Sequence, residues 1–310
     1  INFLRFDQMT SVLYTYDEHW QASHIEDDKA NPNGLLISSY SRVMTFDVTS
    51  SEMITIFGGS KDGHKEYPGN EAEFNDITGF RQIDNVTILA VDSRNHCIRL
   101  LDRVRNSTNS KLGKCTTANF IDGVGREAYF NTPQFIIDGQ YKHEYFITDR
   151  DNNAIRTYDH STGYVGTLIS NIVKPKEIVL NQNRTLLFVT VSNNGVAKVN
   201  ISSKLIEQVY QFQLSTYGIT RLPHTPYLMV THRSVHAITR FTKLGDTLET
   251  VCKVGYAGYR NGDISNCMIK EPSSVRFSFR YRAILIGGYY SIRRLTLSYG
   301  QNGNVTAFTR

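Results

Sequence analysis

The stretch that decides the fold is Tyr145-Phe-Ile-Thr-Asp149-Arg-Asp-Asn152-Asn-Ala-Ile155-Arg156. It consists of an apolar run, a polar turn rich in Asp and Asn, and a second run anchored by a β-branched residue, which is the pattern of a β-hairpin. Strand-forming residues also precede it, at Phe135 to Ile137, and follow it, at Gly166 to Ile169. Together these segments predict a unit of four antiparallel strands, which we name a to d in chain order.

This unit recurs along the chain. Each copy has an apolar run followed by a β-branched anchor, and successive anchors are 55, 57, 41, 39 and 57 residues apart. The anchors are Val43, Ile98, Ile155, Val196, Val235 and Ile292. Repetition at such a period is typical of propellers and other repeat folds. Because closing six blades into a ring solves the edge-strand problem, the sequence predicts an all-β, six-bladed β-propeller of four-stranded antiparallel blades.

We expect one propeller domain over residues 1–310. The predicted blades span approximately 8–57, 77–117, 134–170, 176–213, 217–254 and 273–310. Residues 1–7 are expected to complete the last blade, with Phe3 to Phe6 lying beside Asn304 to Phe308. Val12 to Tyr16 is the expected strand a of the first blade, which makes Asp17 to Asn33 a long polar loop.

Three long linkers between blades share a pattern of Asp/Asn-Gly, a small residue and then an apolar residue. The Gly residues are Gly63, Gly123 and Gly262, the small residues are Ala72, Ala128 and Cys267, and the apolar residues are Phe74, Phe130 and Ile269. Gly permits the positive φ of a tight turn, and we expect the small and apolar residues to pack beneath each linker.

With these motifs, the chain resembles the NHL-repeat family of β-propellers. The best match is the stretch from Tyr145 to Arg156, followed by Asp92-Ser-Arg-Asn95-His-Cys-Ile98-Arg99. The fourth and fifth units depart from the pattern, and the sixth keeps Ile292-Arg293. The resemblance covers nearly the whole chain and is strongest from about 58 to 160.

The four cysteines indicate an oxidising compartment. Although four cysteines allow three connectivities, Cys97 opens a strand c and Cys115 lies near the end of the adjacent strand d. Cys252 ends the next such strand d before Cys267 in its linker, so we predict the disulfides Cys97–Cys115 and Cys252–Cys267. Because the chain starts at Ile1 rather than Met, we expect a processed secreted chain, an ectodomain or a fragment.

Five Asn-x-Ser/Thr sequons predict a glycoprotein. Their asparagines are Asn85, Asn106, Asn183, Asn200 and Asn304. In antiparallel blades the a–b and c–d turns lie on one face of the disc, and the b–c turns and d–a linkers lie on the other. All five sequons map to the first face, which would leave the b–c face free of sugar. The alternative is that turns on both faces are simply rich in Asn and carry no glycan.

The b–c face holds the candidate binding residues. They are Arg42, Arg94, Arg150, Arg233, Tyr289 and Tyr290. Arg and Tyr are enriched in binding hot spots, so we expect a protein or glycan partner with an acidic surface. The alternative is a set of solvated turn residues balanced by nearby aspartates such as Asp92 and Asp149.

These features favour a non-catalytic extracellular binding module without a cofactor. The resemblance also admits enzymes, since similar secreted propellers include a zinc-dependent peptide-amidating lyase and calcium-dependent lactonases. A metal is not expected here, because the predicted inner strands contain no His and only Glu177 is acidic. Zinc would require loop residues such as His64, His96 and His232, and calcium would require Asp76 and Glu177.

RNA binding, as in cytosolic NHL proteins, is a further alternative. The net charge of +5 permits it, but the paired cysteines argue against a cytosolic location. No apolar run approaches the roughly 20 residues of a membrane span, so no insertion into a membrane is expected.

Overall fold

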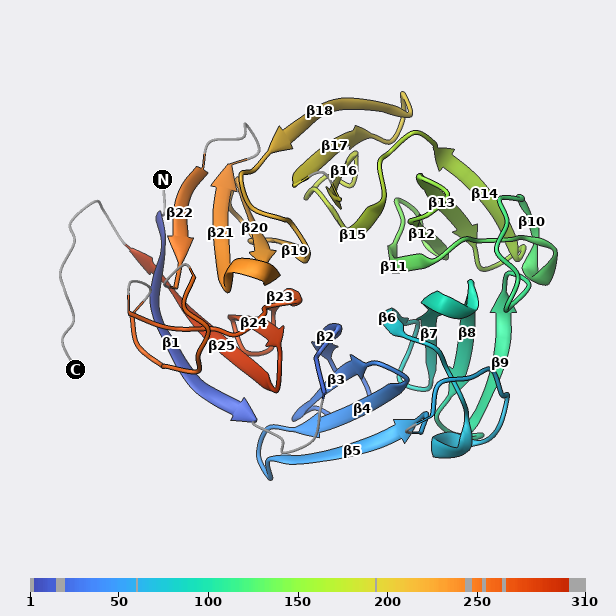
Figure 1. Ribbon diagram of the computed structural model, residues 1–310, viewed down its shortest axis with the longest axis horizontal. Coiled ribbons are helices and arrows are strands. Elements are labelled where there is room, and N and C mark those ends of the chain that lie inside the picture. Colours follow the sequence, from blue (N-terminus) through green and yellow to red (C-terminus); the bar gives the residue numbers. More distant parts are fainter. Residues whose placement is uncertain are drawn as a thin grey trace.

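The computed structural model describes residues 3–14, 20–59, 61–192, 194–242, 247–252, 255–263 and 266–300. In it, six antiparallel sheets surround a central channel (Figure 1). The helical segments in this part of the chain are short 3-10 turns of three residues, and none of its helices is long and apolar enough to cross a membrane. The prediction of a six-bladed, all-β propeller is therefore confirmed.

In five blades, four consecutive strands follow one another outward from the channel, and the third blade adds a short strand at its outer edge. The first two blades comprise His24–Asp27 (β2), Gly34–Ser39 (β3), Arg42–Asp47 (β4), Glu52–Phe57 (β5), Ile77–Gln82 (β6), Thr87–Asp92 (β7), Cys97–Asp102 (β8) and Ser107–Leu112 (β9). The third comprises Gly123–Val124 (β10), Pro133–Asp138 (β11), Glu144–Asp149 (β12), Ala154–Asp159 (β13) and Tyr164–Ile169 (β14). The fourth and fifth comprise Pro175–Leu180 (β15), Leu186–Val191 (β16), Gly195–Asn200 (β17), Leu205–Gln211 (β18), Ile219–Arg221 (β19), Tyr227–His232 (β20), Ala237–Thr242 (β21) and Thr247–Val251 (β22).

The third blade has five strands instead of the expected four. Its extra strand β10 belongs to the linker that precedes the blade, and it pairs with the outer strand β14 through Gly123 opposite Val165 and Val124 opposite Tyr164. The long linker thus covers the outer edge of the blade it leads into.

The sixth blade closes the ring by joining the two ends of the chain. It contains Ser274–Ser278 (β23), Ala283–Gly288 (β24) and Ser291–Gly300 (β25), and its outermost strand is the N-terminal Phe3–Tyr14 (β1). Strand β1 pairs with β25 from Phe3 opposite Gly300 to Tyr14 opposite Ile292. Figure 1 shows β1 beside β25 at the rim of the disc.

Two predictions about the N-terminal region need correction. Val12 to Tyr14 continue β1 in the sixth blade, because the ten-residue β25 offers a pairing partner along their length. The first blade therefore begins at His24 rather than near residue 8, and its inner strand β2 falls in the segment predicted as a loop. The expected partner segment Asn304 to Phe308 lies outside the described residues.

Neighbouring blades share apolar cores that include the linker residues predicted to pack inward. Between the second and third blades, Ile98 and Ile147 join Ala128 and Phe130 in one buried cluster. The equivalent linker residues Ala72, Phe74, Cys267 and Ile269 are also buried.

A buried arginine holds each long linker in place. Arg156 donates from Nη1 to Tyr129 O (2.9 Å) and from Nη2 to Ile121 O (2.9 Å), so one guanidinium bonds both arms of the linker. It also pairs with Asp149, and both side chains are fully buried. Arg99 and Arg293 stand at the same position, one residue after their anchors, and donate in the same way to two carbonyls of their own linkers. The Ile-Arg dipeptide therefore accompanies the long linkers for a structural reason.

Both predicted disulfides are present, with Cα–Cα distances of 5.0 Å for Cys97–Cys115 and 4.7 Å for Cys252–Cys267. Each closes a local loop between a strand and the segment beside it, as the sequence spacing indicated. Two disulfides are consistent with an extracellular or periplasmic location.

Candidate binding sites at the two ends of the channel

The channel is lined by the innermost strand of each blade. These strands are β2, β6, β11, β15, β19 and β23. They all run in the same sense, so the d–a linkers meet at one end of the channel, which we name the b–c end. The a–b turns meet at the other, which we name the a–b end. Because β2 carries His24 and Glu26, the prediction of inner strands that lack His and hold Glu177 as their sole acid is wrong.

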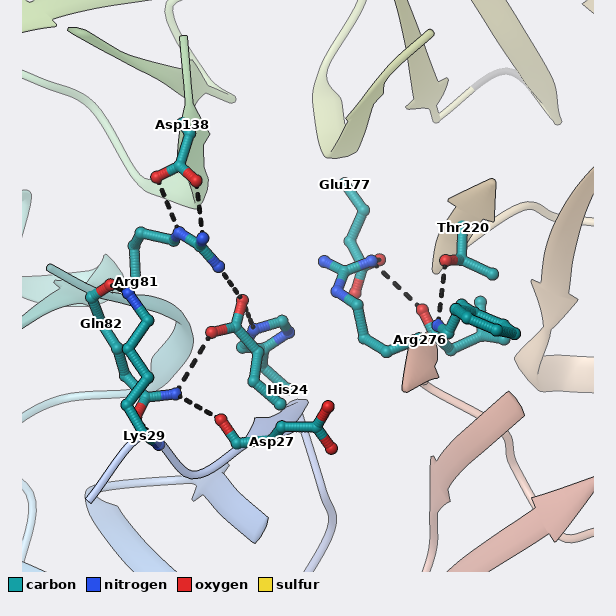
Figure 2. Close-up of polar contacts among 12 residues, drawn as sticks. His24, Asp27, Lys29, Arg81, Gln82, Asp138, Glu177, Thr220 and Arg276 are labelled. Carbon is teal, nitrogen blue, oxygen red and sulfur yellow. Dashed lines mark hydrogen bonds and ion pairs between the residues drawn. The ribbon is translucent and has the colours of Figure 1, made fainter. Parts of the chain in front are cut away.

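A pocket of about 680 Å³ occupies the a–b end, lined by residues from the ends of the inner strands and by the a–b turns. An ion network from three blades forms part of its wall (Figure 2). Arg81 donates from Nε and Nη2 to the two carboxylate oxygens of Asp138 (2.8 and 2.6 Å) and from Nη1 to Glu26 Oε1 (3.0 Å). Burial alone would raise the pKa of Glu26, but the charge of Arg81 and the adjacent His24 ring hold that pKa well below its usual range.

A second ion pair lies across the channel from the first group (Figure 2). Arg276 Nη1 is 3.3 Å from Glu177 Oε2, which also accepts a hydrogen bond from Ile219 N (3.0 Å). Burial raises the pKa of Glu177 to about 7, against the opposing charge of Arg276. Glu177 Oε1 and Arg276 Nη2 are buried and make no hydrogen bond with any described residue.

His24 is fully buried in the channel wall. Its ring meets Phe80 and Phe135 edge-on, with centroids 4.5 and 4.8 Å apart, and its Nε2 is 3.2 Å from Glu26 Oε1. Burial lowers the pKa of His24 to about 4, helped by the charge of Arg276, so the imidazole is neutral at pH 7. Sequence analysis missed this histidine because its strand was predicted as a loop.

The residues considered for metals are not brought together. His96 Nδ1 accepts from Thr132 N, and His232 is bonded to Ser215 O and Thr239 Oγ1. Asp76 and Glu177 each face an arginine. Among the described residues, one group of three possible metal ligands lies close together, and it consists of His64, Cys97 and Cys115. Because those two cysteines form a disulfide, they cannot act as thiolate ligands.

At the b–c end, five tyrosines are connected by hydrogen bonds, electrostatic influence or a shared arginine, and we name this group the tyrosine collar. They are Tyr40, Tyr217, Tyr259, Tyr289 and Tyr290. Tyr290 donates its hydroxyl to Tyr289 Oη (2.6 Å), and Tyr259 donates to Tyr289 O (3.0 Å). Burial and the nearby Tyr289 raise the pKa of Tyr40, which places these two side chains within electrostatic range.

Cationic side chains lie against the aromatic rings of these tyrosines. Lys270 Nζ is 4.6 Å from the centroid of Tyr289, and Tyr217 has Lys176 Nζ at 5.2 Å and Arg233 Cζ at 5.9 Å. Arg233 also pairs with Glu271 (3.2 Å). Sequence reasoning had missed Tyr217, Tyr259, Lys176 and Lys270, because they lie in linkers and strand starts rather than in the repeated b–c turn.

The other predicted arginines reach the collar less directly. Arg42, next to Tyr40, donates to Gly59 O (3.3 Å). Arg94 is 3.6 Å from Asp76, and Arg150 pairs with Asp151 (2.8 Å). The predicted alternative of local charge balance thus holds for these last two arginines, whereas Arg233, Tyr289 and Tyr290 belong to the collar itself.

Two of the turn aspartates, Asp92 and Asp149, do not neutralise the face. Asp92 and Asp149 are fully buried, where they accept hydrogen bonds from Asn75 N (2.7 Å) and Asn131 N (2.8 Å). Burial raises the pKa of each to about 6. They organise the turns from within, and Arg99 and Arg156 are their cationic partners.

Four sequon asparagines lie on the face of the a–b end, as predicted from strand order. Asn85, Asn106 and Asn183 are exposed in turns, and Asn200 ends β17, where its amide donates to Glu207 (2.8 Å). Asn304 lies outside the described residues. The pocket therefore opens on the same face as these sequons, and the tyrosine collar on the opposite one.

No protein-family model and no curated protein sequence matches this chain. An auxiliary nutrient binding protein from Bacteroides ovatus ATCC 8483 matches 95% of this chain and 78% of its own, with 11% identity and a TM-score of 0.69. Streptogramin B lyase matches 96% of this chain and 98% of its own at 11% identity, with a TM-score of 0.57. A nidogen/laminin complex matches 73% of this chain and 78% of its own at 13% identity, with a TM-score of 0.56.

At these identities the likeness shows the fold alone, and that fold is found in binding proteins and in enzymes. The NHL-repeat resemblance remains a prediction. The comparisons and the strand order agree that this chain is a six-bladed β-propeller, built mostly of four-stranded antiparallel blades.

Proposed function

We propose that this chain is a non-catalytic extracellular binding module that holds a protein or glycan partner with an acidic surface at the b–c end of its channel. The observation that carries the proposal is the tyrosine collar, with Arg233, Lys176 and Lys270 placed over its rings. Tyrosine supplies contact area at a low cost in rotamer entropy, and cations beside it attract acidic groups.

The charge around the collar supports an acidic partner. Arg233, Lys176 and Lys270 stand beside the tyrosine rings; Glu271 pairs with Arg233, and Asp76 pairs with Arg94. Because such attraction is screened by salt, binding should weaken as ionic strength rises. The two disulfides support an extracellular site of action, and the predicted glycans lie on the opposite face.

Two single substitutions that create sequons test which face is used. Gln213→Asn produces Asn-Leu-Ser in an exposed linker, where Ser215 Oγ is 2.8 Å from Ser234 Oγ, beside Arg233. The matched control, Thr49→Asn, produces Asn-Ser-Ser in the exposed turn between β4 and β5 on the other face. A glycan at Gln213 would cover the collar, whereas one at Thr49 would not.

The probe is a deca-glutamate peptide, titrated by calorimetry into protein made in a glycosylating host. We expect the Gln213→Asn glycoprotein to lose at least about tenfold in affinity, because a mobile glycan prevents a close-packed interface. The Thr49→Asn glycoprotein should bind within twofold of the parent. The reverse pattern, or equal loss in both, would refute the assignment of the b–c end.

A further inference from the structure

We propose that the pocket at the a–b end is a separate binding site for a small organic anion, with a carboxylate-like group carried on an apolar body. The proposal is independent of the partner at the b–c end. It rests on the size of the pocket, its apolar wall and the surplus of cations that line it.

The pocket has the dimensions and lining of a small-molecule site. Its volume of about 680 Å³ lies within the range of roughly 300–1,000 Å³ found for such sites. Part of the wall is apolar and comes from Ile137, Ile178, Leu180, Pro223, Phe277 and Leu285. Phe279 at the rim is 68% exposed, and its ring meets Phe277 edge-on at 4.9 Å. An inorganic ion would leave this apolar surface uncovered.

The acidic residues of the pocket already have partners. Glu26 and Asp138 are both bound by Arg81. Asp27 Oδ1 accepts a hydrogen bond from Ser278 Oγ (2.6 Å), and Glu177 behind the wall pairs with Arg276. These carboxylates therefore hold the wall together rather than repel an incoming anion.

Four cations of the lining have no carboxylate within ion-pair distance in the described part of the chain. They are Lys29, Arg184, Arg221 and Arg280. Three of them donate only to backbone oxygens: Lys29 to Gln82 O and Ile83 O, Arg184 to Gly139 O, and Arg280 to Asp28 O, Asn31 O and Gly34 O. None of the three forms an ion pair in this part of the chain, although the carboxylates of Asp138, Glu26 and Asp84 act on Lys29 from farther away.

Arg221 is the strongest candidate for contact with the anion. It ends the inner strand β19 and lines the pocket, and within the described residues its half-buried guanidinium makes neither a hydrogen bond nor an ion pair. Burial alone lowers its pKa. A guanidinium kept partly out of water without a partner offers a planar fork for a carboxylate, phosphate or sulfonate group.

Anilinonaphthalene sulfonate is a suitable probe, because it joins an acidic group to an apolar body and fluoresces in apolar surroundings. Neutral phenylnaphthylamine is the matched probe without the charge. We compare the wild type with Arg221→Met and with Arg126→Met, which removes an exposed arginine from a linker outside the pocket. Circular dichroism and thermal melting establish that each variant is folded.

We expect one saturable sulfonate site per chain. Arg221→Met should weaken it about tenfold or more, as for loss of a charge-assisted hydrogen bond, while Arg126→Met leaves it unchanged. Phenylnaphthylamine should bind the wild type and Arg221→Met equally. Benzoate should displace the sulfonate at lower concentration than inorganic phosphate does.

Three results would overturn the proposal. In the first, the sulfonate does not saturate at one site per chain. In the second, Arg221→Met binds the sulfonate with the affinity of the wild type. In the third, Arg221→Met loses as much affinity for phenylnaphthylamine as for the sulfonate. Displacement by phosphate at lower concentration than by benzoate would show that the ligand is not an organic anion. Since deca-glutamate is too long for the pocket, Arg221→Met should still bind it, which separates this test from that of the b–c end.

Discussion

Replacing Arg156 by Met should destabilise the propeller more than any surface change, because this side chain ties a whole linker to its blade. Its guanidinium makes four hydrogen bonds, to Tyr129 O, Ile121 O, Asp122 Oδ1 and Asp149 Oδ2, at 2.6 to 2.9 Å. Met fills much of the same space but leaves the fully buried Asp149 without a cation. Removing one partner of a buried ion pair costs about 3–5 kcal/mol.

Arg293 provides an internal control for the role of the charge. It occupies the same position in the sixth blade and donates to Met268 O, Arg260 O and Asn261 Oδ1. However, Gly288 stands where the second and third blades have Asp92 and Asp149, opposite the first residue of the next strand. Arg293→Met therefore leaves no buried carboxylate behind, and its cost should be smaller by about 2 kcal/mol.

The assay is guanidinium unfolding followed by the fluorescence of Trp20, the single tryptophan of the chain and a buried one. Adding Asp149→Asn to Arg156→Met should restore at least about 1 kcal/mol, because the unpaired charge is then gone. The reasoning is refuted if Arg156→Met costs no more than Arg293→Met, or if the double variant is less stable than Arg156→Met alone.

Three further predictions concern the channel, the disulfides and the closure of the ring. The depressed pKa of His24, about 4 against an ordinary 6.5, means that the unfolded chain binds a proton first, so stability is lost as pH falls through this window. As the pH falls from 7.5 to 4, the wild type should lose about 3 kcal/mol more unfolding free energy than His24→Leu does. Parallel pH profiles of the two proteins would contradict the lowered pKa of His24. Cys252→Ser/Cys267→Ser, which opens a disulfide of sequence separation 15, should cost about 3 kcal/mol in chemical unfolding, and free thiols in peptide maps of the wild type would disprove the bond. Deleting residues 1–14 exposes the edge of β25, so gel filtration should show association, and a monomer of unchanged melting temperature would count against closure by β1.

Five of the six anchors could be predicted from the sequence because the code of the repeat is local; in the fifth blade Val235 falls in a 3-10 turn, and Ile238 takes the anchor position in Ala237–Thr242. The apolar run, the Asp/Asn turn and the Ile-Arg anchor lie within about a dozen residues, and the structure shows why. Asp149 accepts hydrogen bonds from the Asn152 side chain of the turn and from Asn131 N of the linker, and Arg156 pairs with Asp149. The disulfides could be predicted for the same reason, since each closes a short loop between adjacent segments.

Sequence analysis did not identify the inner strand of the first blade, because this strand lines the polar channel. His24-Ile-Glu-Asp27 has one aliphatic residue, Ile25, on the core side, while His24 and Glu26 face the ion network. A strand that lines a polar channel lacks the apolar run on which strand prediction depends. The N-terminal segment, richer in apolar residues, was assigned to the first blade in its place.

The two ends of the channel could not be predicted in detail, because their residues come from different blades. Arg81 lies 55 residues after Glu26 and 57 residues before Asp138, yet its guanidinium bonds both carboxylates. Tyr217 and Lys270 likewise join the collar from linkers that share no motif with Tyr289. Only the closed ring brings these side chains together, and local patterns carry no information about such distances.

The most direct test of the central claim is hydrogen–deuterium exchange of the protein with and without bound deca-glutamate. The account predicts that protection falls on the segments of the tyrosine collar, residues 39–42, 214–217, 232–236, 269–273 and 289–290, and diminishes as salt is raised. Protection confined to residues 178–184, 219–223 and 277–281, which border the pocket at the opposite end, would contradict the claim that the b–c end holds the acidic partner.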